Sequence, residues 1–299
     1  MTGPGALLVI GDVVTDIVAR HRAPLTPGTD TEAEIRSLPG GAGANVACWA
    51  VHAGLRDVRL LARVGAESVA WHGSQLRGAG VRTRLVVDDR SPTATVVALV
   101  DSAAERTFLT DSGAALRLSA DDWSPDLLDG VGHLHISGYL LFAEASRGAV
   151  LPAIREAHTR GIPVSVDPAS SGFITAVGVD RFLALTEGVD VLLPNAAEAS
   201  VLTDLPEPAD AAAKLSRHAA LVAVTLGARG ALLAASGAVT ARIPPVDARA
   251  VDSTGAGDAF TGGFLAARLT GANDTTAAVT GCRMGAQAVA SLGGRPPPS

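Results

Sequence analysis

The stretch from Val251 to Leu269, VDSTGAGDAFTGGFLAARL, constrains the fold of this chain more than any other. Phe260, Phe264 and Ala267 recur with a helical period, so the pattern predicts a helix that begins near Gly255. The glycine-rich turn before this helix leaves backbone N–H groups uncovered by side chains. Such a helix N-terminus binds anions, because its unpaired donors and the helix dipole point the same way.

Asp258 falls in the first turn of the predicted helix. A carboxylate beside an anion-binding turn is electrostatically unfavourable unless it has a chemical task. It can accept the proton of a nucleophile that attacks a bound phosphate. We therefore expect Asp258 to be a general base, and the amides of Gly255, Ala256, Gly257 and Asp258 itself to form an anion hole.

The same stretch carries a family resemblance. DSTGAGDAFTGGF resembles the carboxy-terminal signature of the ribokinase-like (PfkB-type) carbohydrate and nucleoside kinases, D-T-x-G-A-G-D-x-F-x-G. An ordinary helix cap explains a single G-x-G but not a match of this length. The resemblance implies transfer of the γ-phosphoryl group of ATP, with Mg²⁺, to a hydroxyl of a sugar or sugar-like substrate.

Composition narrows the class of protein. The 299 residues are 47% hydrophobic and carry a net charge of −6, which favours a sizeable core and argues against nucleic-acid or anionic-membrane partners. Lys214 is the single lysine and lies in no glycine-rich loop, so a Walker A motif is excluded. Cys48 and Cys282 form no CxxC pair, which favours free thiols. With neither a signal-peptide pattern nor a long apolar window, we expect a cytoplasmic protein.

Strands and helices alternate along most of the chain. Ala6–Ile10 is a continuous apolar run, typical of a strand buried on both faces. From His133 onward the strands end in 137–139, 167–168, 194–195 and 227. This rhythm predicts an α/β fold with a doubly wound, mostly parallel sheet flanked by helices. We expect residues 1–299 to form one ribokinase-like kinase domain.

Two acidic residues follow the first strand. Asp12 comes directly after Gly11, and Asp16 lies four residues further on. Ligands of open parallel sheets bind beyond the carboxyl ends of the strands, so both aspartates are candidates to bind hydroxyl groups. On spacing alone, a turn aspartate and a solvated aspartate explain the pattern equally well.

A second glycine-rich turn precedes another helical run. Gly40, Gly41 and Asn45 belong to GGAGANVA, which resembles the G-G-x-x-x-N-x-A signature of the same kinases. The resemblance implies that these residues bind the substrate, since an asparagine can both donate to and accept from a sugar diol. Ala42 stands where many relatives have lysine, which bears on the substrate that fits. The third glycine of a dinucleotide fingerprint is absent, which disfavours an oxidoreductase.

A hairpin is predicted in the first half of the chain. Segments 93–101 and 106–110 are short and β-branched. The resemblance implies a small β-sheet lid, built from about 17–38 and 85–111, that closes over the sugar and excludes water. For Arg106 we favour a solvated edge-strand arginine. An exposed lid edge could also pair across a two-fold axis in a homodimer.

Nucleotide and metal candidates follow later strands. Asn195 and Glu198 form a capping-box pattern and also resemble the family's N-x-x-E motif, which implies a place near Mg²⁺, through water, and the ATP phosphates. Thr225, Gly227 and Gly230 resemble its T-x-G-x-x-G nucleotide segment. By the same resemblance, Asp252 is a candidate ligand for a monovalent cation such as K⁺.

Alternatives stay open. His133 and His135 share one strand face, and we favour interior histidines over metal ligands because no third ligand is evident. A nucleoside kinase on the same fold is an alternative to a sugar kinase, although few aromatic residues (Trp49, Trp71, Phe108, Tyr139) lie near the substrate segments. A non-catalytic sensor with this fold is disfavoured, because Asp258 and the glycines are all present.

Overall fold

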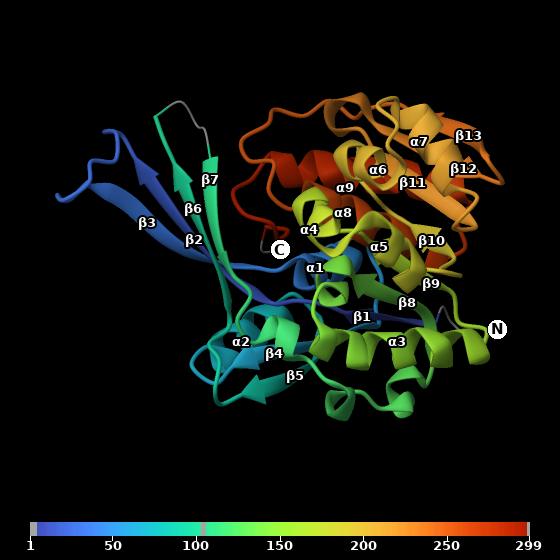
Figure 1. Cartoon of the computed structure of the whole chain (residues 1–299), viewed down its shortest axis with the longest axis horizontal. Helices are drawn as coiled ribbons and strands as arrows, with labels where there is room; N and C mark the ends of the chain where they lie inside the picture. Colours follow the sequence, from blue (N-terminus) through green and yellow to red (C-terminus); the bar gives the residue numbers. More distant parts are fainter. Residues whose placement is uncertain (1–4, 103–105, 298–299) are drawn as a thin grey trace.

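The computed structural model describes residues 5–102 and 106–297, which form two β-sheets and the helices that cover the larger one (Figure 1). The large sheet has the order β13-β12-β11-β10-β9-β8-β1-β4-β5, with parallel pairing from β11 to β5 and antiparallel pairing of β11 with β12 and of β12 with β13. The predicted fold class is confirmed. The strands are β1 (Ala6–Ile10), β4 (Val58–Gly65), β5 (Arg82–Asp88), β8 (Val131–Ser137), β9 (Val164–Asp167), β10 (Val191–Leu192), β11 (Leu221–Thr225), β12 (Ala231–Ala235) and β13 (Ala238–Ile243).

The first strand is buried on both faces, as its apolar run predicts. Alternate side chains enter two different cores, because successive residues of a strand point to opposite faces. Leu8 and Ile10 face one core and Leu7 and Val9 face the other. Helices close both cores, so this sheet is covered on its two sides.

Each core has its own set of helices. One side is covered by α1 (Ala42–His52), α2 (Val69–Gly78), α8 (Ala256–Leu269) and α9 (Asp274–Val289). The other is covered by α3 (Glu144–Thr159), α4 (Ser171–Val177), α5 (Val179–Leu185), α6 (Ala196–Thr203) and α7 (Pro208–Leu215). Within the described residues, no helix has both the length and the hydrophobicity needed to span a membrane.

Small residues let α8 pack closely against its neighbours. A Cβ placed on Gly262 would lie 2.7 Å from the carbonyl oxygen of Val46 in α1. A Cβ on Gly263 would lie 2.5 Å from the side chain of Met284 in α9. These glycines of α8 therefore lie at packing contacts, and close packing against α1 brings the N-termini of α1 and α8 together.

The small sheet has the order β3-β2-β6-β7 and projects from the main body (Figure 1). Its strands are β2 (Val14–His21), β3 (Ala33–Gly40), β6 (Ala94–Val100) and β7 (Arg106–Asp111). The predicted hairpin is the antiparallel pair β6 and β7. The expected boundaries of about 17 and 85 need correction, because residues 85–88 belong to β5 of the large sheet and the small sheet begins at Val14 and Ala94.

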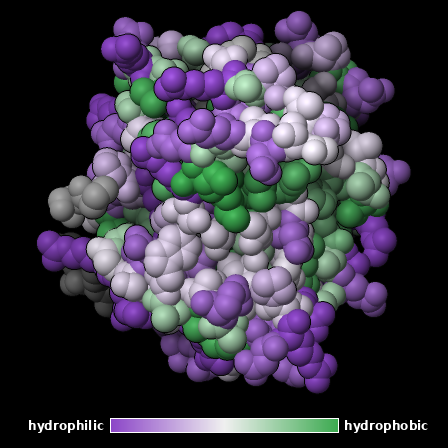
Figure 2. Space-filling model, turned by 90° about the vertical axis from the view of Figure 1, so that its left-hand side faces the viewer, coloured by the Kyte–Doolittle hydropathy of each residue, from purple (hydrophilic) through white to green (hydrophobic). Residues whose placement is uncertain are grey.

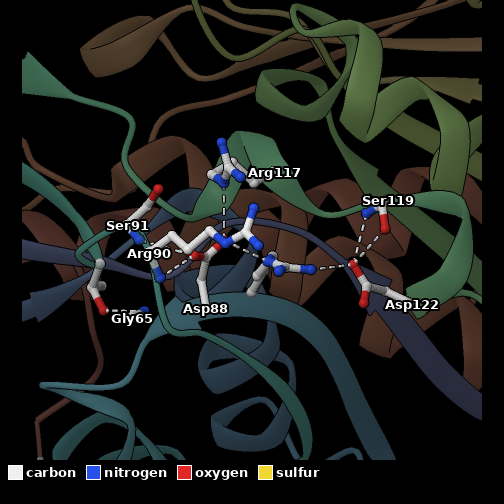
Figure 3. Close-up of polar contacts among 9 residues, drawn as sticks. Gly65, Asp88, Arg90, Ser91, Arg117, Ser119 and Asp122 are labelled. Atoms are coloured by element: carbon white, nitrogen blue, oxygen red, sulfur yellow. Dashed lines mark hydrogen bonds and ion pairs between the residues drawn. The ribbon is translucent and has the colours of Figure 1, made fainter.

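A buried carboxylate anchors the base of the small sheet (Figure 3). Asp88, at the end of β5, is 2% exposed. Its Oδ1 accepts from the backbone amides of Arg90 and Ser91, at 2.8 and 2.9 Å, and its Oδ2 accepts from Nε of Arg63 and Arg117, at 2.9 and 3.0 Å. These hydrogen bonds hold the pKa of Asp88 well below its usual value, although burial opposes them.

The chain entering and leaving the hairpin is held by the same region. Thr93, just before β6, accepts from the amide of Gly65 at 2.8 Å and donates its own amide to Glu67 at 2.8 Å. Arg117, which binds Asp88, lies just after β7. Both ends of the hairpin are thus fixed to the turn regions that follow β4 and β5.

Candidate active site

A cavity of about 480 Å³ lies between the small sheet and the carboxyl ends of the large sheet's parallel strands. This position agrees with the rule that open α/β sheets bind ligands beyond the carboxyl ends of their strands. The structure brings nine of the sequence candidates to the cavity wall. They are Asp12, Asp16, Gly41, Asn45, Asn195, Glu198, Thr225, Gly257 and Asp258.

The N-terminus of α8 opens into this cavity. Gly255 is its N-cap with a left-handed φ of 74°, and Ala259 N–H donates to its carbonyl at 2.8 Å. Gly257 and Asp258 line the cavity. Their amides belong to the first helical turn, where N–H groups have no intrahelical acceptor. Gly255 and Ala256 are not among the lining residues.

Gly255 instead packs against the backbone of Gly294. A Cβ on it would lie 2.5 Å from the Cα of Gly294, in the segment that follows α9. A Cβ on Gly294 would in turn lie 2.3 Å from Nδ2 of Asn45. The carbonyl of Gly294 accepts from the buried indole of Trp49 at 2.8 Å. The carboxy-terminal segment is therefore wedged between the two glycine-rich turns.

Asn45 and Asp258 are in direct contact. Nδ2 of Asn45 donates to Oδ2 of Asp258 at 2.8 Å. Burial raises the pKa of Asp258 well above its usual value, and the nearby carboxylates of Asp167 and Asp12 raise it further, while the Asn45 hydrogen bond opposes them. In its ionised form, a carboxylate with a raised pKa is a stronger proton acceptor than an ordinary aspartate.

Both carboxylate oxygens of Asp12 accept hydrogen bonds from other groups of the protein. Its Oδ1 accepts from Ser137 Oγ at 2.7 Å and from Gly43 N–H at 3.2 Å, and its Oδ2 accepts from Ala42 N–H at 2.8 Å. Asp12 therefore satisfies the first amides of α1, a favourable place for a negative charge.

Asp16 is the freer of the two aspartates. It lines the cavity from β2, and among the described residues no protein group donates a hydrogen bond to it. Its carboxylate lies over Gly40, where an added Cβ would meet Oδ2 at 2.1 Å. Burial and the charge of Asp12 raise its pKa to about 6, with Arg295 opposing.

Glu198 and Asp167 form an acidic corner of the cavity beside the N-terminus of α6. Asn195 Oδ1 accepts from Glu198 N–H at 2.9 Å, and Glu198 Oε2 accepts from Asn195 N–H at 2.9 Å, so the predicted capping box is present. Glu198 is 4% exposed, and burial together with Asp167 raises its pKa to about 8. Asp167, at the end of β9, has a pKa raised to about 6 by burial.

Sequence reasoning did not single out Asp167. It ends the strand PVSVD and lines the cavity, so the rule for strand ends that selected Asp12 could have found it. Tyr139 and Phe173 also line the cavity, with ring centroids 5.7 Å apart, and Phe108 faces it from β7. The expectation that few aromatic residues lie near the substrate needs correction, because Phe173 in α4 reaches the site only through the fold.

The acidic corner fits a magnesium ion. Burial raises the pKa values of Asp167 and Glu198, and repulsion between the two carboxylates adds to the rise at Glu198, so a bound cation would favour the ionised form of both. No group of three or more candidate metal-binding side chains was found in residues 5–102 and 106–297. Such an arrangement is compatible with Mg²⁺, which keeps several waters and uses few protein ligands beside substrate phosphates.

Several candidates lie outside the cavity wall. Gly40 ends β3, and its carbonyl accepts from Nη2 of Arg295 at 3.2 Å. Gly227 is exposed. Gly230 has a φ of 86°, and a Cβ added to it would clash with the carbonyl oxygen of Ile243, so this glycine is needed for the turn into β12. Asp252 accepts from the amides of Thr254 and Gly293, at 2.8 and 3.1 Å.

The paired histidines of β8 are interior residues. Hydrogen bonds join Ser165 Oγ to Nε2 of His133 at 2.8 Å and to Nδ1 of His135 at 2.9 Å. Burial lowers the pKa of both histidines to about 3, so they are neutral at physiological pH. The interpretation as interior histidines agrees with this geometry.

Comparison with known proteins decides the family. Residues 5–299 match the model of the pfkB family carbohydrate kinases. The chain belongs to this family. A fructokinase from Klebsiella pneumoniae is 30% identical over 277 residues, covering 88% of this chain and 84% of the relative. The chain is thus a carbohydrate kinase that transfers phosphoryl groups.

Solved structures agree on the fold. An adenosine kinase from Sinorhizobium meliloti superposes with a TM-score of 0.86 at 24% identity, covering 98% of this chain and 96% of that one. A protein described as a ribokinase II from E. coli, solved in complex with ATP and Mg²⁺, gives 0.85 at 24% identity, covering 97% and 94%. At this level of identity the likeness concerns the fold alone.

Proposed function

We propose that this protein transfers the γ-phosphoryl group of MgATP to a hydroxyl of a small sugar or sugar-like substrate. The observation that carries the proposal is the meeting of Asp258 and Gly257, at the N-terminus of α8, with Asn45 and Asp16 around one cavity. A proton acceptor, an anion-binding helix end and free hydroxyl-binding groups are the parts that phosphoryl transfer to an alcohol needs.

Each group has a place in the reaction. Asp16 and Asn45 hold the substrate hydroxyls. Among the described residues, no group donates a hydrogen bond to Asp16, and Asn45 Oδ1 is buried without a partner. Asp258 takes the proton of the attacking hydroxyl as its oxygen bonds to the γ-phosphorus. The bond between that phosphorus and the bridging oxygen breaks, and ADP leaves. The amides of Gly257 and Asp258 stabilise the transferred group's negative charge.

Fewer residues are candidates for binding the nucleotide. Asn195 and Thr225 line the cavity beside the acidic corner, and Gly227 follows in the exposed turn after β11. Mg²⁺ held near Glu198 and Asp167 would neutralise the phosphates. We extend the proposal to a monovalent cation beside Asp252, whose test is the rate in K⁺ against Na⁺ at equal ionic strength.

A phosphorylation screen tests the proposal. Purified protein is given MgATP and, separately, ribose, fructose, adenosine and other nucleosides, and ADP release is compared with the rate without acceptor. Acceptor-dependent ADP release that disappears in Asp258→Asn supports the proposal. If no acceptor raises ADP release above the hydrolysis background, or if the variant keeps the wild-type rate, the assignment is wrong.

A nucleoside acceptor is the second candidate. Phe108, Tyr139 and Phe173 give the cavity an aromatic end on which a base could stack. Phe173→Ala would then raise KM for nucleosides more than KM for simple sugars. Equal effects on both would favour the sugar.

We also propose a homodimer formed through the lid. The strand register places Ile35, Ile17, Val97 and Leu109 on the lid face opposite Phe108, and Ile35 and Leu109 are 65% and 58% exposed. Figure 2 shows apolar residues gathered across the middle of the molecule seen from the lid side. Light scattering on the wild type and on Leu109→Asp tests it; a wild-type monomer would refute it.

A further inference from the structure

The acidic side chains that line the cavity are not matched by basic ones among its described lining residues. Among its described lining residues there are six acidic side chains and no lysine, arginine or histidine. The six come from both sheets, from the loop after β1 and from two helices that cover the large sheet, so acidic groups lie on several sides of the cavity. They are Asp12, Asp16, Asp111, Asp167, Glu198 and Asp258.

Among the described residues, no cationic side chain lines the cavity beside these carboxyl groups. Arg295 lies near enough to Asp16 to lower its pKa, but it is not part of the cavity wall. A nucleotide brings its own Mg²⁺ to offset its phosphates, but an acceptor brings no such cation. A like charge placed inside a cleft with low-dielectric walls is repelled more strongly than in water.

Two arginines near the acceptor end need to be considered. Arg295 lies behind Gly40, to whose carbonyl it donates, and it lines a different cavity, beside Cys48 and His52. Arg106 begins β7, two residues before Phe108 in the chain. Its side chain is not among those that the structure describes, and the experiment below treats it separately.

We propose that this cavity selects an acceptor without negative charge, a neutral polyol such as a sugar or a nucleoside, and rejects sugar acids and sugar phosphates. The proposal rests on the proposed function in taking this cavity as the acceptor site. It is independent of whether the neutral acceptor carries a base.

We call the expected preference for uncharged over anionic acceptors the charge rule. Isothermal titration calorimetry with Mg²⁺ and a non-hydrolysable ATP analogue present tests it directly. The ligands form pairs of similar size: fructose with fructose 6-phosphate, glucose with gluconate, and ribose with ribose 5-phosphate. At pH 7.5 the neutral member of any pair that binds should bind at least ~10-fold more tightly. A charged member that binds as tightly as its neutral partner, or binding by charged ligands alone, overturns the proposal.

Turnover is measured on the same panel. If a neutral ligand binds preferentially but none is phosphorylated, the kinase assignment fails while the charge rule stands. If a sugar acid or sugar phosphate is phosphorylated with the highest kcat/KM, the charge rule fails while the kinase assignment stands. The two failures are therefore distinguishable.

A matched pair of variants adds a gain-of-function test. Thr110 is exposed and lines the cavity, whereas Thr159, at the end of α3, is exposed and is not among the residues that line it. Thr110→Lys should improve the ratio of charged to neutral binding by ~10-fold or more, and Thr159→Lys should leave it unchanged. Equal ratios in the two variants count against the proposal.

Arg106→Gln completes the design. The proposal expects the same preference for neutral acceptors in this variant as in the wild type. If the wild type binds an anionic acceptor and Arg106→Gln loses that binding selectively, Arg106 supplies the missing cation and the proposal is wrong. Melting temperatures of all three variants check that the fold is retained.

Discussion

The amide nitrogen of Asn45 lies 2.8 Å from a carboxylate oxygen of Asp258, although 213 positions separate the two residues in the chain. The contact joins the first turns of α1 and α8, two helix N-termini that follow glycine-rich turns. Gly294 packs against both turns and holds them at this distance. One hydrogen bond thus links the proposed substrate side of the cavity to the proposed phosphoryl-transfer side.

Replacing Asp258 with asparagine should remove the proton acceptor and leave the shape of the site unchanged. We expect kcat to fall by about 10²–10⁴ while the melting temperature stays close to that of the wild type. Asp210→Asn is a matched control, because Asp210 is also an acidic residue in the first turn of a helix but is exposed and does not line the cavity. Near-normal turnover by Asp258→Asn would show that another group takes the proton.

Removing the Asn45 donor should move the pH dependence of the reaction. The hydrogen bond from Asn45 lowers the pKa of Asp258 against burial and the nearby carboxylates. In Asn45→Ala this pKa therefore rises, and the base is ionised only at higher pH. The acidic limb of the kcat/KM profile should shift to higher pH. A lower rate with an unmoved limb would mean that Asn45 acts through substrate contacts alone.

Gly257→Ala separates ligand approach from folding. A Cβ on Gly257 meets no protein atom within 4 Å and its φ is ordinary, so stability should stay level or rise by up to about 1 kcal/mol. The added methyl group would nevertheless lie at the cavity wall, where the phosphoryl group must approach. We expect kcat to fall by about tenfold or more. Gly78→Ala in α2, equally free of contacts, should keep full activity.

The acidic corner should make the ligand-free protein less stable at alkaline pH. Glu198 has a pKa of about 8 in the folded state against 4.5 as its model value, so between these values the folded state holds a proton that the unfolded state has lost. Stability contributed by this group therefore falls as pH rises through that window. Glu198→Gln should flatten the decline in melting temperature between about pH 5 and pH 8.

Added Mg²⁺ should have the opposite pH trend, because it binds the ionised carboxylates. The exposed Glu187→Gln serves as the control and should follow the wild type. A decline in Glu198→Gln as steep as in the wild type would assign the effect to other groups.

Asp88→Ala should loosen the base of the lid. The substitution leaves Arg63, Arg117 and two backbone amides without their shared acceptor (Figure 3). Arg63 keeps Asp122 and Arg117 is half exposed, so the main loss is the acceptor of the two amides, which costs roughly 1–3 kcal/mol of unfolding free energy, measurable by urea denaturation. We also expect KM for the acceptor to rise more than KM for ATP. Asp129→Ala removes an exposed partner of Arg160 and should change neither.

Local patterns were readable from the sequence. The start of α8 at Ala256 with Gly255 as its cap, and the Asn195–Glu198 capping box, depend on residues within four positions of each other. The strand β1 follows from its own apolar run. Such elements are decided by hydrogen bonds and periodicity within a single turn or strand, so a short stretch of sequence contains what is needed to predict them.

The boundaries of the lid were predicted less well. Residues 85–88 are as β-branched and apolar as those of the hairpin, but they pair with β4 in the large sheet. Strand pairing is settled by partners far away in the chain, so composition alone could not separate β5 from β6. The same reason hid Phe173, whose helix α4 brings it beside Tyr139 only in the folded chain.

By itself, then, the sequence determined the kinds of groups present: two glycine-rich turns that begin helices, carboxylates after strands, and a chain long enough to bury a doubly wound sheet. Only the tertiary structure decided which of those groups share the cavity and that Asn45 reaches Asp258. It also decided that Asp12 accepts from the first amides of α1, whereas Asp16 receives no hydrogen bond from the part of the chain that the structure describes. The physical reason is that burial, charge interaction and packing against Gly294 depend on distances in space, which close packing of distant segments sets and local pattern does not.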